Sequence, residues 1–244
     1  MDSRSLATDL KFLPSGDRGL LVKVGETVDP KISLQVHALR EVISKRNLYG
    51  VEDLVPAYCS LLILFDPLKT NYHSLVRHIQ DLHFNPASAD ASPQRCIEIP
   101  ICYDIGFGPD LADVAAIHRI TEAEVIRQHS NVNYLVYFIG FCPGFPYMGE
   151  VPSSIATPRL PRPRVRVPAG SVGIAGNQTG IYPIETPGGW RLIGRTPLKL
   201  FDPRNNPPNL LVPGDGVRFV SISRVEFEAI DLAVRRGSYR LVVS

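Results

Sequence analysis

Glycine and proline are concentrated in one third of this chain of 244 residues. The stretch from Gly140 to Gly216 holds 12 of the 19 glycines and 14 of the 22 prolines. Because proline cannot donate a hydrogen bond to a central strand, this stretch favours edges, bulges and loops over a flat central sheet. Short apolar runs separated by turn residues predict a β-barrel or sandwich here, with strands over residues 165–167, 172–174, 180–182 and 198–201.

The first third of the chain alternates strand and helix patterns. Residues 19–24 and 61–65 are apolar runs typical of strands. Apolar residues at helical spacing predict helices over residues 30–47 and 75–82. We therefore expect a small N-terminal α/β sandwich domain over residues 1–84.

A linker and a second domain follow. Residues 85–94 contain no large apolar side chain, which is the composition of a linker. A strand over residues 96–102, two helices and a strand over residues 134–139 precede the Gly/Pro-rich third, and a helix and a strand over residues 239–243 follow it. The chain is thus predicted to be α+β, with its second domain over residues 95–244.

The charge of the chain is small but unevenly distributed. A net charge of +2 and a pI near 8.4 do not predict a nucleic-acid partner, for which a domain pI above roughly 9 is usual. Between Gly140 and Leu200, seven basic side chains accompany only two acidic ones, Glu150 and Glu185, so this segment is +5 and the remainder is −3. A localised basic surface favours a small-molecule anion such as a carboxylate or a phosphate.

Targeting and membrane signals are absent from the sequence. Residues 1–12 lack the apolar core of a signal peptide, so we expect a cytoplasmic protein. The uncharged stretch from Asn131 to Gly149 is interrupted by Pro143, Gly144 and Pro146. This leaves about ten apolar residues where a spanning helix needs roughly 20, and no membrane association is predicted.

Several chemical signatures are also absent. The four cysteines and six histidines show no metal-ligand spacing, so we expect no metal site and assign the cysteines as reduced thiols. There is no GxSxG or HExxH motif. There is also no GxxxxGK[ST] motif, so any ATP used is not held by a P-loop in this chain.

The strongest candidate site lies between Arg162 and Gly180. In an extended segment, Arg162, Arg164 and Arg166 would project from one face as a cationic ridge. The glycines that follow would allow the backbone to approach an anion closely, beside polar side chains at Ser171, Gln178 and Thr179. The alternatives are a solvated strand face for the arginines and structural turns for the glycines.

Glu185 and His129 are the candidate acid–base groups. Glu185 is the acid nearest in sequence to the ridge and could act as a general base, although orienting an arginine is the commoner role. His129 could act as a general acid or base, but a helix C-terminal cation is the more frequent case. Tyr182 and Trp190 fit a core and a pocket wall equally well.

Longer motifs connect these residues to a known family. These motifs are Gly140-Phe-Cys-Pro-Gly-Phe-Pro-Tyr-Met-Gly149, Thr157-Pro-Arg159, Arg166-Val-Pro-Ala-Gly-Ser-Val-Gly-Ile-Ala-Gly176, Gln178-Thr-Gly-Ile-Tyr-Pro183 and Glu185-Thr-Pro-Gly-Gly-Trp190. They resemble the allophanate hydrolase subunit 1 family, also called the 5-oxoprolinase PxpB or KipI family, over essentially the whole chain. The departures are Asn177 for a second glycine, Met148 for leucine, and Arg162 as an extra cation.

The resemblance implies a fold, an activity and partners. The implied fold is a small α/β domain followed by a cyclophilin-like β-barrel domain. The implied activity is the ATP-dependent opening of 5-oxo-L-proline to L-glutamate, with Mg²⁺, in an enzyme subunit that is inactive without its partners. Those partners are a homologous second subunit, of the type of the 5-oxoprolinase C component or allophanate hydrolase subunit 2, and a third, lactam-handling subunit.

Residue roles are assigned on these motifs. Catalysis is assigned to Glu185 and His129, and we expect Arg166→Ala to abolish activity while leaving the fold intact. Substrate binding is assigned to the polar and aromatic positions of the Gly/Pro-rich third, namely Arg164, Arg166, Ser171, Gln178, Thr179, Tyr182 and Arg195.

Two other functions stay open. One is a KipI-like inhibitor of a sensor histidine kinase. The other is a carboxyltransferase component acting on urea or allophanate-type amides. The only methionines are Met1 and Met148, so this chain has no Met-Lys-Met biotin attachment site, and biotin would have to arrive on another polypeptide.

Overall fold

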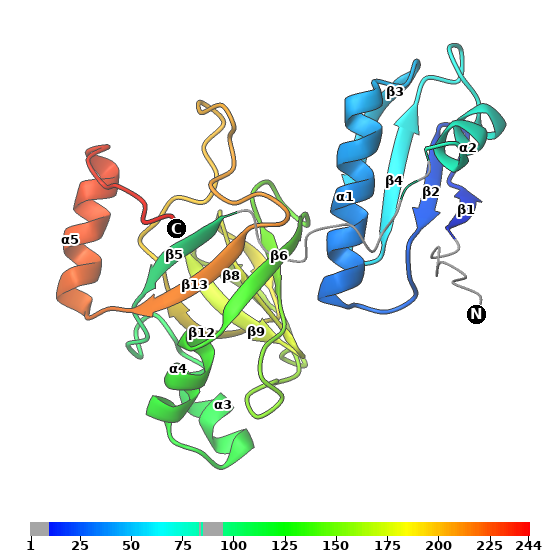
Figure 1. Ribbon diagram of the computed structural model, residues 1–244. Coiled ribbons are helices and arrows are strands. Elements are labelled where there is room, and N and C mark those ends of the chain that lie inside the picture. Colours follow the sequence, from blue (N-terminus) through cyan, green and yellow to red (C-terminus); the bar gives the residue numbers. More distant parts are fainter. Residues whose placement is uncertain (1–9, 83, 85–94) are drawn as a thin grey trace. The chain divides into compact units, whose positions relative to one another are not determined.

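The structure is a computed structural model that describes residues 10–82, 84 and 95–244 (Figure 1). The chain divides into two compact units, residues 1–92 and 93–244. The linker predicted over residues 85–94 lies outside the described residues. Both units mix helices and strands, so the α+β class is confirmed.

The first unit is a two-layer sandwich of one antiparallel sheet and two helices. Leu20 of β2 lies opposite Ile63 of β4, Val22 lies opposite Leu61, and all four side chains are fully buried. Both helices contribute buried residues to the same core, so they cover this one face. In sheet order the strands are β1 (Lys11–Pro14), β2 (Gly19–Lys23), β4 (Ser60–Phe65) and β3 (Val51–Pro56), and the helices are α1 (Pro30–Arg46) and α2 (Tyr72–Gln80).

Local signals set both ends of α1. The Asp29 carboxylate accepts a hydrogen bond from the Lys31 backbone N–H at 2.7 Å, and Pro30 occupies the first turn, where its missing N–H costs nothing. The helix ends where Asn47 adopts a left-handed conformation, with φ of 46°. The helix predicted over residues 30–47 is therefore present.

The second unit is built on a curled seven-stranded sheet (Figure 1). All neighbouring strands are antiparallel except β13 and β5, which run parallel. In sheet order the strands are β12 (Arg191–Arg195), β9 (Ser171–Ala175), β10 (Gln178–Ile181), β7 (Pro146–Gly149), β6 (Asn133–Ile139), β13 (Gly216–Ser221) and β5 (Cys96–Ile101). This curled sheet is consistent with the expected cyclophilin-like fold.

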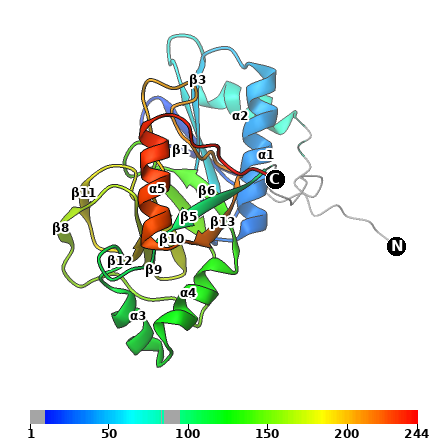
Figure 2. The same ribbon diagram turned by 90° about the vertical axis from the view of Figure 1, so that its left-hand side faces the viewer.

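Three helices and a small second sheet complete this unit. The helices are α3 (Leu111–His118), α4 (Glu122–Ser130) and α5 (Arg224–Arg235), and Figure 1 shows α3 and α4 at one end of the curled sheet. The side chains of Ser223 and Glu226 each accept a hydrogen bond from the other residue's backbone N–H, which fixes the start of α5. The strands β11 (Thr186–Gly188) and β8 (Arg164–Val167) pair only with each other, at the outer edge of the unit (Figure 2).

Two predicted strands are wrong. Residues 198–201 form only an isolated bridge, between Phe201 and Asn209. Here Asp202 binds both Lys199 and Arg204 and folds the chain into a turn. Residues 239–243 are irregular, although Val243 forms a bridge with Ile97 of β5.

Among the residues that the structure describes, no helix has both the length and the apolar character needed to cross a membrane.

Candidate functional site

A pocket of about 240 Å³ lies in the unit of residues 93–244. Its walls come from three segments of the Gly/Pro-rich third, which the curled sheet and the β11–β8 pair bring together. Most of the lining side chains are aromatic or proline rings, and Arg159 is the one charged side chain among them. The lining residues are Phe141, Phe145, Tyr147, Arg159, Pro163, Tyr182, Pro187, Gly188, Gly189 and Trp190.

Phe145 is the centre of the aromatic wall. Its ring centroid lies 4.9 Å from that of Tyr147, 5.2 Å from that of Tyr182 and 5.3 Å from that of Trp190. The contacts with Tyr182 and Trp190 are edge-to-face, an arrangement that aromatic quadrupoles favour. Phe141, which also touches Phe145, is 61% exposed, so the wall extends from the core to the surface.

Two glycines are required by this aromatic packing. A Cβ on Gly188 would lie 2.4 Å from the Tyr182 hydroxyl oxygen. A Cβ on Gly180 would lie 2.9 Å from atoms of both Phe145 and Trp190. The glycine-rich motif therefore makes room for rings at these positions, which is a different role from the anion-binding backbone expected from the sequence.

Arg159 supplies the positive charge of the pocket. Its guanidinium carbon lies 5.7 Å from the centroid of the Trp190 ring, a cation–π contact. Within the described part of the chain, no carboxylate is paired with Arg159. Burial raises the pKa of Tyr147 and of Tyr182, and the charge of Arg159 partly offsets this rise at both phenols.

Tyr182 is the one residue with an assigned role that lines the pocket. It is also 1% exposed and belongs to the small core cluster around Phe145, so it is at once a core residue and a pocket wall. Trp190 has the same double position. The two alternatives that the sequence left open for these rings are therefore both observed.

Arg164 is directed away from solvent toward Asp110. Its guanidinium donates to the Asp110 carboxylate at 2.5 Å, and the other oxygen of that carboxylate accepts the Leu192 backbone N–H at 2.7 Å. The carboxylate is almost fully buried. Arg164 thus ties β8 to the residue that precedes α3, and its charge is already neutralised by a partner.

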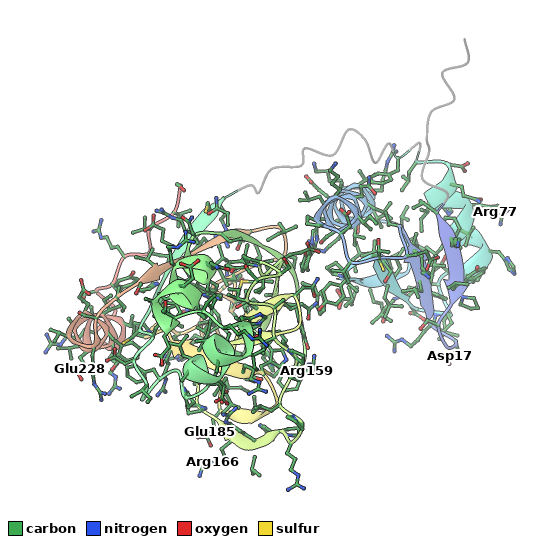
Figure 3. The ribbon with its side chains drawn as sticks, turned by 90° about the horizontal axis from the view of Figure 1, so that it is seen from below. Asp17, Arg77, Arg159, Arg166, Glu185 and Glu228 are labelled. Atoms are coloured by element: carbon green, nitrogen blue, oxygen red, sulfur yellow. The ribbon has the colours of Figure 1, made fainter. Side chains whose placement is uncertain are left out.

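Arg166 and Glu185 form an ion pair on the surface. The Arg166 guanidinium donates to the Glu185 carboxylate at 2.6 Å, and Figure 3 shows the two side chains together at the outer edge of the unit. With Arg164 bound to Asp110, the expected row of unpaired cations is not present. Because β8 pairs only with β11, Val165 between the two arginines is also exposed, at 81%.

We expect the Arg166–Glu185 pair to contribute little to stability. Both side chains are at least half exposed, and ion pairs in water typically contribute about 0–1 kcal/mol. Arg166→Ala and Glu185→Ala should each shift the midpoint of thermal unfolding by no more than a few degrees. A loss of the activity implied by the sequence motifs in either folded variant would support the assigned roles, whereas full activity in both variants would contradict those roles.

His129 is a fully buried core residue. Its ring stacks on Phe219 at 4.6 Å between centroids. Nδ1 contacts the Tyr103 hydroxyl at 2.8 Å, and Nε2 contacts the Thr179 hydroxyl at 3.0 Å. Since the Thr179 hydroxyl donates to the Gly173 carbonyl, Nε2 must carry the proton and donate to Thr179, and Nδ1 accepts from Tyr103. Burial lowers the pKa of His129 to about 3, so the ring is neutral.

The other candidate residues are distributed over the same sheet. Ser171 and Thr179 are buried in β9 and β10, and Gln178 begins β10. Arg195 donates to the Ala169 carbonyl at 2.8 Å and lies 5.8 Å from the Phe107 ring centroid. None of the four lines the pocket.

The pocket residues without an assigned role are Arg159 and the rings around it. From the sequence, Arg159 belongs only to the basic segment and to a family motif. The signal that could have identified it is its position between prolines 158 and 161, in a segment with few acids to pair with it. Phe145 and Tyr147 also line the pocket, but their positions next to and within β7 are those of ordinary turn and strand residues, so the sequence alone does not single them out.

Among residues 10–82, 84 and 95–244, no group of three or more His, Cys, Asp or Glu side chains is arranged to hold a metal ion.

Together these features define an α+β domain with a small aromatic pocket that carries one cation. Residues 10–211 match the family model described as "carboxyltransferase domain, subdomain C and D", and the chain belongs to this family. The resemblance stated from the sequence motifs is confirmed by relatives in the same family.

Three known proteins show the range of this similarity. The chain is 42% identical over 224 residues to the 5-oxoprolinase PxpB protein of Bacillus subtilis (strain 168), covering 88% of this chain and 93% of that protein. The crystal structure of TTHA0988 matches with a TM-score of 0.76 at 38% identity, covering 84% of this chain and 40% of that one. The K. lactis urea amidolyase matches with a TM-score of 0.77 at 21% identity over 96% of this chain and 16% of that one, which shows the shared fold alone.

Proposed function

We propose that this chain is a subunit of a 5-oxoprolinase, which opens 5-oxo-L-proline to L-glutamate. The observation that carries the proposal is the 42% identity to the Bacillus 5-oxoprolinase PxpB protein over 93% of that protein's length. The aromatic pocket around Arg159 is the candidate substrate site, because it joins apolar walls to a cation that no carboxylate of the described residues neutralises. A cytoplasmic location fits this role.

ATP dependence is part of the proposal. A lactam is too unreactive for easy hydrolysis, so phosphoryl transfer to its oxygen is a chemically reasonable use of ATP. The pocket does not fit ATP, because 240 Å³ is below the roughly 300–1,000 Å³ of pockets that enclose drug-sized ligands. We therefore assign ATP and Mg²⁺ to a site outside this pocket.

Partner subunits are the second element of the proposal. The Bacillus relative is named as one of several subunits of an enzyme, and this chain spans 40% of the TTHA0988 chain and 16% of the urea amidolyase chain. A segment that occurs inside longer chains, and elsewhere as a separate subunit, is expected to work beside other polypeptides. We propose a homologous second subunit and a third, lactam-handling subunit as those partners.

The test is glutamate formation from 5-oxo-L-proline and ATP. The assay is run with this chain alone, with the proposed partner subunits alone, and with all subunits combined. We expect glutamate only from the complete set. Formation of glutamate without this chain, or no glutamate from the complete set, would contradict the proposal.

A second candidate function is a carboxyltransferase component acting on urea or allophanate-type amides. It is favoured by the family description and by the structural similarity to a urea amidolyase. Urea-dependent transfer of a carboxyl group from a biotinylated carrier, measured in the same combined preparation, distinguishes it from lactam opening. The kinase-inhibitor alternative stays a prediction from resemblance.

A further inference from the structure

The pocket's size limits its ligand to a small molecule. Its volume of about 240 Å³ is less than that of pockets built for drug-sized ligands. The rings of Phe145, Tyr182 and Trp190 are held by mutual edge contacts and by a buried core, so the walls are preformed. Flat, rigid apolar walls at this scale suit a single small ring.

The pocket's charge indicates an anionic group on that ring. Arg159 is held over Trp190 and has no carboxylate partner in the described part of the chain. The acid nearest in sequence to the pocket residues, Glu185, is already bound to Arg166. Arg159 is exposed, so its guanidinium is accessible to a ligand at the mouth of the pocket. A guanidinium without an acidic partner binds a carboxylate through charge-assisted, often bidentate, hydrogen bonds.

Backbone forms part of the pocket surface as well. Gly188 and Gly189 line it without side chains, and the Gly189 carbonyl accepts the Leu160 backbone N–H at 2.7 Å. The Tyr182 ring lies against Gly188, where an added Cβ would be 2.4 Å from the Tyr182 hydroxyl oxygen. A small ring can therefore lie against this part of the wall without meeting a side chain.

We propose that this pocket binds a small cyclic monocarboxylate, with the carboxylate on Arg159 and the ring between Trp190, Tyr182 and Phe145. The identification of that ligand as 5-oxo-L-proline rests on the proposed function. The preference for a small ring with one carboxylate rests on the pocket alone. Arg159 is then the residue that selects substrates by charge.

The test is direct binding to the full chain, alone and in the complete assembly. Equilibrium dialysis measures affinity for 5-oxo-L-proline, and the fluorescence of Trp190, the single tryptophan of the sequence, locates the ligand in the isolated chain. The neutral amide of the same lactam and inorganic phosphate are the comparison probes. We expect saturable binding of the acid with a change in Trp190 emission, and at least tenfold weaker binding of both comparison probes.

Arg159→Gln tests the cation, and Arg162→Gln is its matched control. Arg162 is exposed, close in sequence and outside the pocket lining. Loss of a hydrogen bond to a charged group should weaken 5-oxo-L-proline binding about tenfold or more in Arg159→Gln and leave Arg162→Gln unchanged. Arg159→Gln should not weaken binding of the neutral amide. Circular dichroism confirms that both variants are folded.

Two results would overturn the inference. One is the absence of saturable 5-oxo-L-proline binding to both the chain and the assembly. The other is equal affinity in the wild type and Arg159→Gln. If the assembly still formed glutamate in that case, the proposed function would stand and the site would be elsewhere. Arg159-dependent binding without glutamate formation would support the site and contradict the proposed function.

Discussion

Replacing Arg164 with methionine is expected to lower the free energy of unfolding by about 3 kcal/mol. The loss arises because the Asp110 carboxylate, 5% exposed, would keep only the Leu192 N–H as a hydrogen-bond donor. A buried carboxylate without its cation is costly, and the partial exposure of Arg164 moderates the cost. Urea unfolding of the wild type and the variant measures the difference.

Two further variants separate this ion pair from a general loss of charge. Arg162→Met, at the neighbouring exposed arginine, should change stability by less than about 0.5 kcal/mol. Adding Asp110→Asn to Arg164→Met should recover part of the loss, because the unpaired charge is then removed. An Arg164→Met protein as stable as the wild type would contradict the stabilising role of the Arg164–Asp110 ion pair.

Acidification is expected to destabilise the protein through His129. Burial lowers the pKa of His129 to about 3 in the folded chain, whereas an unfolded histidine titrates near 6.5. Between these values the unfolded chain binds a proton that the folded chain does not. The stabilisation is therefore complete above about pH 6.5 and is lost as the pH falls toward 3, at up to about 1.4 kcal/mol per pH unit.

The comparison with His129→Gln isolates this effect from the carboxylates that also titrate in acid. The phenols of Tyr103 and Tyr134, which contact His129, have pKa values raised by burial and do not titrate in this range. We expect the variant to be less stable at pH 7 but to lose less stability between pH 6.5 and 4. Parallel stability curves for the two proteins would contradict the assignment of a neutral, buried ring.

The sequence predicts the elements of this fold better than it predicts their ends. Helix α1 is recognisable because Val36, Leu39 and Ile43 repeat at helical spacing and all three are buried. Strand β4 is recognisable as a continuous apolar run. The predicted strands at residues 198–201 and 239–243 are wrong. Ion pairs around Asp202 determine the first segment, a few backbone hydrogen bonds to β5 determine the second, and no local pattern encodes either.

The candidate site is less predictable than the fold because its chemistry depends on distant partners. The alternation of arginine with apolar residues correctly places Arg164 and Arg166 on a strand. Whether Arg164 is available to a ligand depends on Asp110, 54 positions away in the sequence, which binds it in an ion pair. An imidazole such as that of His129 can act as an acid–base catalyst, but the structure surrounds His129 with core residues. The significance of Arg159 depends on the absence of an acidic partner among the described residues, and only the folded chain reveals such an absence.

Residues 242–244 pair antiparallel with the start of β5, which places the two ends of the second unit side by side. Backbone hydrogen bonds join Cys96 and Ser244 in both directions, next to the bridge between Ile97 and Val243. A domain whose ends meet can be spliced into a longer polypeptide, or circularly permuted, with little disturbance of its core. The same geometry would let a designer graft this unit into a host loop with two short connections.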